Sequence, residues 1–152
     1  MTASPDVLKS RAYLERLDNP TPMTRRIMSG VFKDMNRTVC RRTFRAGQMR
    51  GVVAVTARFT SAVDHAALKT TIETLMKDRA VACGEIWSAV DPNEFPINEE
   101  ERLRGGDNKI GACLLVETLR LADAERYAAE VARQFPTADV GVYRVLCEIR
   151  LA

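Results

Sequence analysis

The hydrophobic positions of the chain follow strand-like and helix-like spacings in a definite order. The stretch Gly111–Arg150 opens with an apolar run at 112–116, continues with a mixed apolar and polar segment at 123–135, and ends in an alternating segment from Val140. This order predicts a strand, a helix and a second strand, which together form one βαβ unit. The same order occurs earlier, at Gly51–Val90, so the pattern predicts two βαβ units.

Two successive units of this kind predict an α+β fold of the ferredoxin-like type. The element order β-α-β-β-α-β gives an antiparallel sheet in the spatial order 4-1-3-2, and right-handed crossovers place both helices on one face. The long polar connection Asp91–Lys109 is typical either of a flap with a role or of a mobile loop. The predicted strands are 52–59, 81–90, 110–119 and 140–151, and the predicted helices are 65–77 and 123–135.

The first fifty residues precede this pattern and predict a helical extension. The sequence Ser4-Pro5-Asp6 is typical of a helix start, and a second helix is predicted from Thr24 to about Met35, where apolar residues recur at helical spacing. Thr38–Arg45 alternates loosely and predicts an edge strand or an extended connector. We therefore expect an N-terminal extension at 1–50 that packs on a core domain at 51–152.

Basic side chains concentrate in the same N-terminal fifty residues. The formal net charge of the whole chain is +3, but this segment carries eleven basic and four acidic residues, a balance of +7 that leaves −4 on the remainder. Such an arm can bind nucleic acid or an anionic surface, supply arginines to an anionic small molecule, or pack across acidic residues of its own chain or a partner. Nucleic acid is not expected, because the arm has few aromatic residues for base stacking and no recognised module.

The composition predicts a globular protein of the cytoplasm. Of the 152 residues, 46% are hydrophobic and 28% charged, and the apolar runs are far shorter than the roughly 20 residues of a membrane span. The N-terminus lacks the apolar segment of a secretory signal. The four cysteines lie far apart with no CxxC pair, so neither a metal site nor a disulfide is expected. We expect no cofactor, with haem as a minor alternative.

Glu85 and Glu117 are the candidate catalytic pair. Alternation puts Glu85 and Trp87 on one side of the second predicted strand and Glu117 on one side of the third. Because these strands run antiparallel, we expect the two carboxylates to lie close together on the face away from the helices. Neighbouring carboxylates shift each other's pKa, and one of them can serve as a general base. The alternative is an ordinary solvated sheet face with cross-strand ion pairs.

Other candidate residues are expected on the same face or at its margin. Arg58 and Arg144, with Glu148 nearby, could hold an anionic group near the opposite end of the strands. Trp87 could stack on a flat ligand or fill a dimer core. His65 is the only histidine and begins a predicted helix, so we expect a surface residue, with an acid–base or ligand role as the minor alternative. No GxSxG nucleophile motif accompanies it.

The two-unit layout at 51–90 and 111–150 resembles the dimeric α+β barrel group of ferredoxin-like proteins. That group includes antibiotic-biosynthesis-type monooxygenases, EthD-like proteins and muconolactone-isomerase-like proteins. The resemblance covers about two-thirds of the chain and rests on element order. It implies a homodimer with two sheets packed face to face, and small aromatic or polyketide-like ligands bound between each sheet and its helices or covering loops. It carries over no catalytic residue by motif.

Two functional hypotheses follow. The first is a small-molecule enzyme, an isomerase, lyase or cofactor-independent monooxygenase, that acts on a small acidic or aromatic metabolite. The second is a non-catalytic ligand-binding or protein-assembly module that docks on a partner through its basic arm. The expected partners are a small-molecule ligand and a second copy of the chain, with no nucleic acid and no membrane. The candidate catalytic residues are Glu85, Glu117 and His65, and the candidate substrate-binding residues are Arg58, Trp87 and Arg144.

Overall fold

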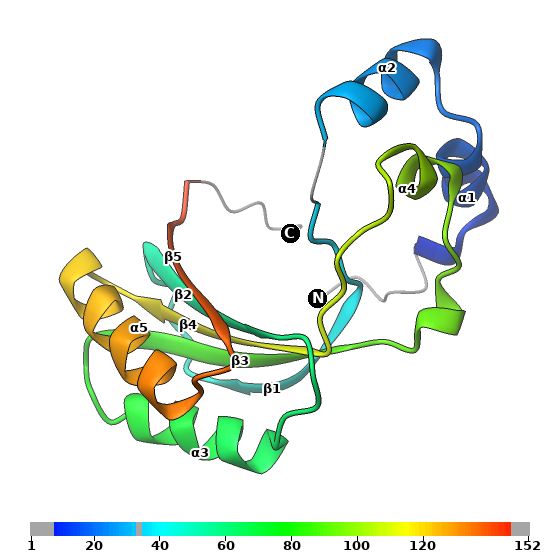
Figure 1. Ribbon diagram of the computed structural model, residues 1–152. Helices are drawn as coiled ribbons and strands as arrows, with labels where there is room; N and C mark the ends of the chain where they lie inside the picture. Colours follow the sequence, from blue (N-terminus) through cyan, green and yellow to red (C-terminus); the bar gives the residue numbers. More distant parts are fainter. Residues whose placement is uncertain (1–7, 33–34, 147–152) are drawn as a thin grey trace. The chain divides into compact units, whose positions relative to one another are not determined.

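The computed structural model describes residues 8–32 and 35–146 of the chain. The chain divides into two compact units (Figure 1). The helical unit comprises the residues up to Arg41 together with Ala89–Ile110, and the sheet unit comprises Arg42–Ser88 together with the residues from Gly111 onward. The expected division at residue 50 stays a prediction.

Five strands form one open antiparallel sheet, and four of them have the predicted spatial order. The strands are β1 (Cys40–Ala46), β2 (Val53–Phe59), β3 (Val81–Ala89), β4 (Ala112–Thr118) and β5 (Asp139–Arg144). They lie in the order β1-β3-β4-β2-β5, in which the last four reproduce the predicted 4-1-3-2 arrangement. Strand β1 adds an edge next to β3, which confirms the edge-strand interpretation of this segment.

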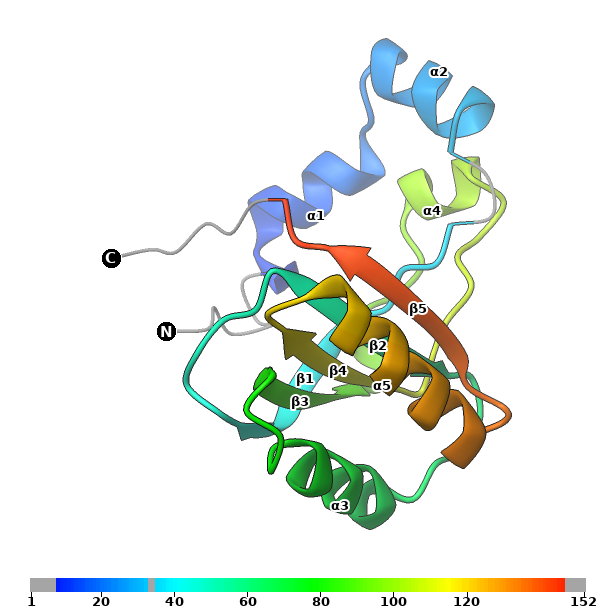
Figure 2. The ribbon, with the colours of Figure 1, turned by 90° about the vertical axis from the view of Figure 1, so that its left-hand side faces the viewer.

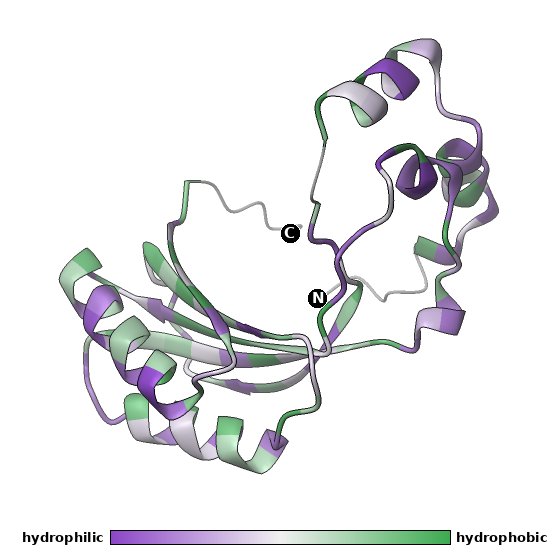
Figure 3. Cartoon of the chain, viewed as in Figure 1, coloured by the Kyte–Doolittle hydropathy of each residue, from purple (hydrophilic) through white to green (hydrophobic). Residues whose placement is uncertain are grey.

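Two helices cover one face of this sheet and enclose its core. Helices α3 (His65–Leu75) and α5 (Leu121–Gln134) lie on the same side of the strands (Figures 1 and 2). Along α5 hydrophobic and hydrophilic residues alternate at helical spacing (Figure 3), so one stripe faces the sheet. The core residues come from both layers: Val55, Ala57 and Phe59 of β2, Leu114 and Val116 of β4, Leu68 and Ile72 of α3, and Tyr127 and Val131 of α5.

The close contact of α3 with β3 depends on a glycine. A Cβ atom placed on Gly84 would lie 2.4 Å from Cγ2 of Ile72, closer than real Cβ contacts. Ile72 itself is fully buried. At its other end α3 begins with Asp64 as N-cap, whose side chain accepts a hydrogen bond from the backbone N–H of Ala66 at 2.9 Å. The predicted start of this helix is therefore confirmed.

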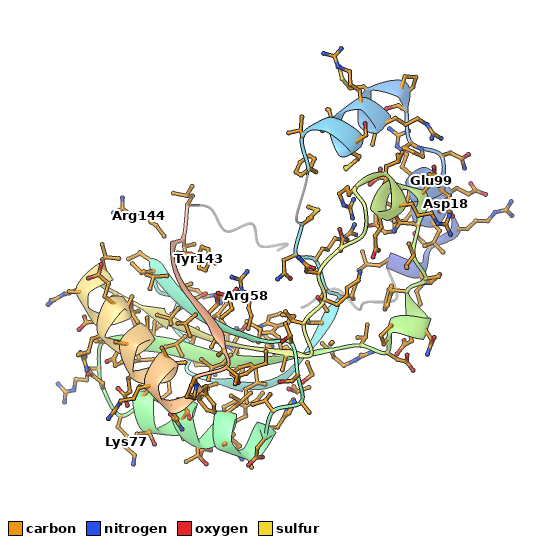
Figure 4. All side chains as sticks on the ribbon, in the orientation of Figure 1. Asp18, Arg58, Lys77, Glu99, Tyr143 and Arg144 are labelled. Atoms are coloured by element: carbon orange, nitrogen blue, oxygen red, sulfur yellow. The ribbon has the colours of Figure 1, made fainter. Side chains whose placement is uncertain are left out.

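The helical unit combines the N-terminal helices with the long connection between β3 and β4. It contains α1 (Arg11–Asp18), α2 (Pro22–Gly30), the 3₁₀ turn Pro92–Glu94 and α4 (Glu99–Leu103). Helix α4 packs against both α1 and α2. Asp18 accepts a hydrogen bond from the backbone N–H of Glu99 at 3.2 Å (Figure 4), and Arg25 lies 3.5 Å from the Glu99 carboxylate. The connection is thus an ordered part of a small helical layer.

Some helix and strand ends differ from the bounds predicted from the sequence. Helix α2 begins at Pro22, two residues before the predicted start, because Thr21 caps it and proline is favoured in the first turn. It ends at Gly30 rather than near Met35, since glycine disfavours continuation of a helix. Strand β5 ends at Arg144, and the rest of its predicted length from residue 147 lies outside the described residues. The predicted helix start at residues 4–6 also lies outside them.

None of the helices in residues 8–32 and 35–146 combines the length and the apolar character that a membrane crossing requires.

Candidate functional site

Glu85 and Glu117 lie together on the sheet face opposite α3 and α5. Their strand neighbours Ile86 and Val116 belong to the core, so alternation turns both glutamates to the other face. The register pairs Cys83 with Glu117, which makes Glu85 a diagonal neighbour of Glu117. Three arginines from β1 and from the connection after it surround the two carboxylates. We call Arg42, Arg45, Arg50, Glu85 and Glu117 the arginine–glutamate cluster.

The Glu85 carboxylate is buried and fully engaged. Its residue exposure is 2%, and Oε1 lies 3.0 Å from Nη1 of Arg42 and 3.0 Å from Nη1 of Arg45. Its Oε2 accepts a hydrogen bond from the indole Nε1 of Trp87 at 2.9 Å. The Arg42 guanidinium also lies 5.9 Å from the Trp87 ring centroid, in range of a cation–π contact. Trp87 is therefore held by the cluster on its polar edge and by a cation on its ring.

Glu117 holds the connection between β1 and β2. Its Oε1 accepts a hydrogen bond from Nη1 of Arg50 at 2.8 Å, and its Oε2 accepts from the backbone N–H of Gly51 at 2.9 Å. Arg50 Nη1 also lies 3.9 Å from Glu85 Oε1, so it links the two carboxylates. A side chain at Gly51 would place Cβ 2.4 Å from the backbone oxygen of Thr118, which explains the glycine here. Because β1 lies beside β3 and β2 beside β4, this connection crosses two strands, and Glu117 fastens it.

The thiol of Cys83, which lies beside the arginine–glutamate cluster, has little nucleophilic character. Cys83 donates to Oε2 of Glu117 at 3.5 Å. Burial, and then the negative charges of Glu117 and Glu85, raise the pKa of Cys83 to about 11. The sulfur is therefore protonated near neutral pH, and only a thiolate is a strong nucleophile.

The arginine–glutamate cluster pairs basic residues of the N-terminal fifty residues with acidic residues of the same chain. This pairing is one of the three uses that the sequence predicts for these arginines.

The two arginines predicted to hold an anion do not share a face. Arg58 lies opposite Asp139 in the ladder and pairs with its carboxylate at 2.5 Å. Arg144 lies opposite the core residue Val53, so it belongs to the other face and to the other end of β5. In Figure 4 the Arg144 side chain points away from Arg58. The expectation of a shared anion site was wrong because the register of β5 was not known, and Glu148 lies outside the described residues.

His65 is the first residue of α3 and is exposed. It lies on the helix layer and not on the face that carries Glu85 and Glu117, so the structure does not join it to that pair. Its acid–base role stays a prediction. Among the described residues no group of three His, Cys, Asp or Glu side chains could hold a metal ion.

The helical unit contains a pocket that the sequence did not predict. Its volume is about 620 Å³, and it lies between residues 38–39 and the connection 89–110. Its walls are mainly apolar and include a few charged side chains. The apolar lining residues are Val39, Ala89, Val90, Pro92, Phe95, Pro96, Ile97 and Ile110, and the charged ones are Asp91, Glu101, Asp107 and Lys109.

A buried ion pair holds the pocket-lining residue Asp107 in place. Arg104 donates from Nε to Oδ1 of Asp107 at 2.9 Å and from Nη2 to Oδ2 at 2.7 Å, and both side chains are essentially inaccessible. The hydrogen bonds that Arg104 donates to Asp107 raise the pKa of Arg104, so the guanidinium stays charged. Gly105 and Gly106 between them have φ angles of 85° and 95°, which other residues rarely adopt. The tight turn carries Lys109, whose Nζ lies 2.9 Å from Oε1 of buried Glu101.

A second, smaller pocket adjoins the first. Its volume is about 70 Å³, and it shares with the larger pocket the wall residues Val39, Phe95, Pro96, Glu101 and Lys109. Its remaining lining comes from the N-terminal segment and one residue of the connection. These residues are Leu8, Lys9, Tyr13, Leu14, Leu17, Arg37 and Glu94.

The only sequence signal for these pockets was the length of the connection. The wall residues come from segments about fifty residues apart in the chain and follow no strand or helix period. The short helix α4 begins after Asn98, whose side chain caps it, and its sequence pattern gives no indication of a cavity beside it.

Comparison of the chain with protein-family models, with curated proteins and with solved structures finds no significant match.

Proposed function

We propose that this protein binds a small, largely apolar molecule in the 620 Å³ pocket of its helical unit. The observation that carries the proposal is the combination of volume and lining. Small-molecule sites are typically concave, mostly apolar and in the range of roughly 300 to 1,000 Å³, with a few fixed polar groups. The pocket between residues 38–39 and 89–110 has each of these properties.

The charges in the wall also favour a ligand with an apolar body. Arg104 neutralises Asp107, and Lys109 neutralises Glu101, within the wall itself. A ligand that covers these pairs leaves neither charge without its partner, so the cost of burying an isolated ion does not arise. The buried Arg104–Asp107 pair also keeps the turn before Lys109 in one conformation, and a preformed site loses less entropy when a ligand binds.

The direct test uses the neutral fluorophore N-phenyl-1-naphthylamine, whose emission rises in apolar surroundings. We expect saturable binding with one site per chain. Val90→Trp, which fills the pocket from a half-buried wall position, should weaken binding at least about tenfold, more than the loss of a single apolar contact.

A second variant excludes an effect of misfolding. Ile97 lines the pocket and is 58% exposed, so Ile97→Trp should fold normally and still weaken binding. Val52 is 57% exposed in the sheet unit, which makes Val52→Trp a matched control with unchanged affinity. Absence of saturable binding, or equal affinity in all three tryptophan variants and the original chain, would contradict the proposal.

Catalysis on the open sheet face is the second candidate function, favoured by the link that Arg50 makes between Glu85 and Glu117 beside Trp87. In this hypothesis the protein is a small-molecule isomerase, lyase or monooxygenase, and a second copy covers the face. It requires Glu85 or Glu117 to exchange a proton although arginines occupy their oxygens. We rank it below the pocket for that reason. The two candidates predict different binding sites for an aromatic probe.

A further inference from the structure

We propose that the ligand carries an acidic group, a carboxylate or sulfonate, which the smaller pocket receives at Arg37. This inference rests on the proposed function of the larger pocket and names the class of its ligand. The observation behind it is the state of charge of the residues that line the 70 Å³ pocket. Three of these residues are basic and two are acidic.

Two of the basic residues are already paired with carboxylates. Lys9 lies 2.6 Å from Glu94, and Lys109 lies 2.9 Å from Glu101. The third, Arg37, is half-buried and donates from Nη2 to the neutral hydroxyl of Tyr13 at 3.1 Å. Within residues 8–32 and 35–146 it makes no ion pair. A guanidinium has five N–H donors in a rigid fork, so Arg37 retains donors for a planar anion.

The volumes of the two pockets agree with a ligand that has an acidic head group and an apolar body. A volume of about 70 Å³ exceeds the roughly 10 to 15 Å³ that one water needs, so a carboxylate or sulfonate fits there. The shared wall residues Val39, Phe95 and Pro96 continue from this pocket into the larger apolar one. A molecule with an acidic end and an apolar body would thus fill both pockets. An aliphatic or aromatic acid is the simplest ligand of this kind.

Two fluorophores with the same ring system distinguish the contribution of the acidic group to binding from that of the apolar body. N-phenyl-1-naphthylamine is neutral, and 8-anilinonaphthalene-1-sulfonate adds one sulfonate to the same ring system. We expect Arg37→Met to weaken binding of the sulfonate about five- to tenfold, the usual effect of one charge-assisted contact, and to change binding of the neutral amine less than about twofold. Arg37→Lys should fall between, because it keeps the charge and loses the fork. Arg79→Met, at an exposed position of the sheet unit, is the matched control.

The charge of the neighbouring pair gives an effect of opposite sign. Glu101→Gln keeps the size of the side chain and removes a negative charge from the shared wall, so it should strengthen binding of the sulfonate relative to that of the neutral amine. Added salt should weaken sulfonate binding in the original chain and have less effect in Arg37→Met.

The outcomes distinguish this inference from the function on which it rests. If neither fluorophore binds saturably, the proposed function fails. If Val90→Trp weakens binding of both fluorophores but Arg37→Met changes binding of neither, the proposed function of the larger pocket is supported and the acid site at Arg37 is refuted. An equal loss of affinity for both fluorophores in Arg37→Met would also refute the acid site, since Arg37 would then contribute only to the shape of the wall.

Discussion

At the scale of single residues, the buried charges within residues 8–32 and 35–146 occur in compensated groups. Glu85 meets Arg42 and Arg45, and Asp107 meets Arg104. A buried ion that loses its partner costs several kcal/mol, whereas a satisfied pair is close to neutral for stability. The groups therefore fix where segments lie more than they add net stability. Arg37 departs from this pattern, which is why it carries the inference about a ligand.

Substitution of Glu85 should show how much stability is lost when the partners of a buried carboxylate lose their acceptor. Glu85→Ala leaves two half-buried guanidinium groups and the indole N–H of Trp87 without their acceptor. We expect the free energy of unfolding to fall by about 2–3 kcal/mol, measured by urea denaturation. Glu73→Ala removes an exposed carboxylate that pairs with Lys69 on α3 and should cost less than about 0.5 kcal/mol. Equal effects of the two substitutions would show that the cluster does not anchor β1.

The Asp78 side chain predicts an acid-dependent loss of stability. Hydrogen bonds from Tyr127, from the backbone N–H of Ala80 and from Arg126 lower the pKa of Asp78 from 3.8 to about 2. Because the folded pKa is the lower one, this contribution is present above pH 3.8 and is lost as the pH falls through 2. Melting temperatures measured between pH 5 and pH 2 should therefore fall less steeply in Asp78→Asn than in the original chain. Parallel curves would contradict the assignment.

At the scale of elements, the sequence predicts what is locally periodic. Strands β2, β3 and β4 and helices α3 and α5 begin and end within two residues of their predicted bounds, since each carries a continuous apolar pattern. The proximity of Glu85 and Glu117 also follows from alternation and strand order. The arginines around them could not be predicted, because they depend on the path of the connection across β3 and β4. The pocket could not be predicted either, since its walls combine 38–39 with 89–110 without any period.

The packing of α3 on β3 gives a test at this scale. Gly84→Ala would place a methyl group 2.4 Å from Ile72, so helix and strand must separate. We expect a loss of about 1–3 kcal/mol in the free energy of unfolding, the usual cost of overpacking a core. Gly30→Ala on α2 meets no atom within 4 Å and should be neutral or slightly stabilising. A neutral Gly84→Ala would show that α3 does not lie this close to the sheet.

At the scale of the whole molecule, the chain builds two units from interleaved segments. The sheet unit contains the two βαβ repeats and β1 as a fifth strand. The helical unit combines the N-terminal helices with an insertion between β3 and β4, and the insertion supplies most of the pocket wall. The repeated units thus form the scaffold, and the part of the sequence without a repeat forms the candidate binding site.

The location of a bound probe tests this account most directly. Backbone amide and indole signals of the isotope-labelled protein would be followed by NMR during titration with 8-anilinonaphthalene-1-sulfonate. We predict that the largest shifts fall on residues 37–39 and 89–110, with little change in the indole N–H of Trp87, the only tryptophan of the chain. Shifts centred on Trp87, Glu85 and Glu117, with the residues of the pocket unchanged, would contradict the pocket and support chemistry on the sheet face.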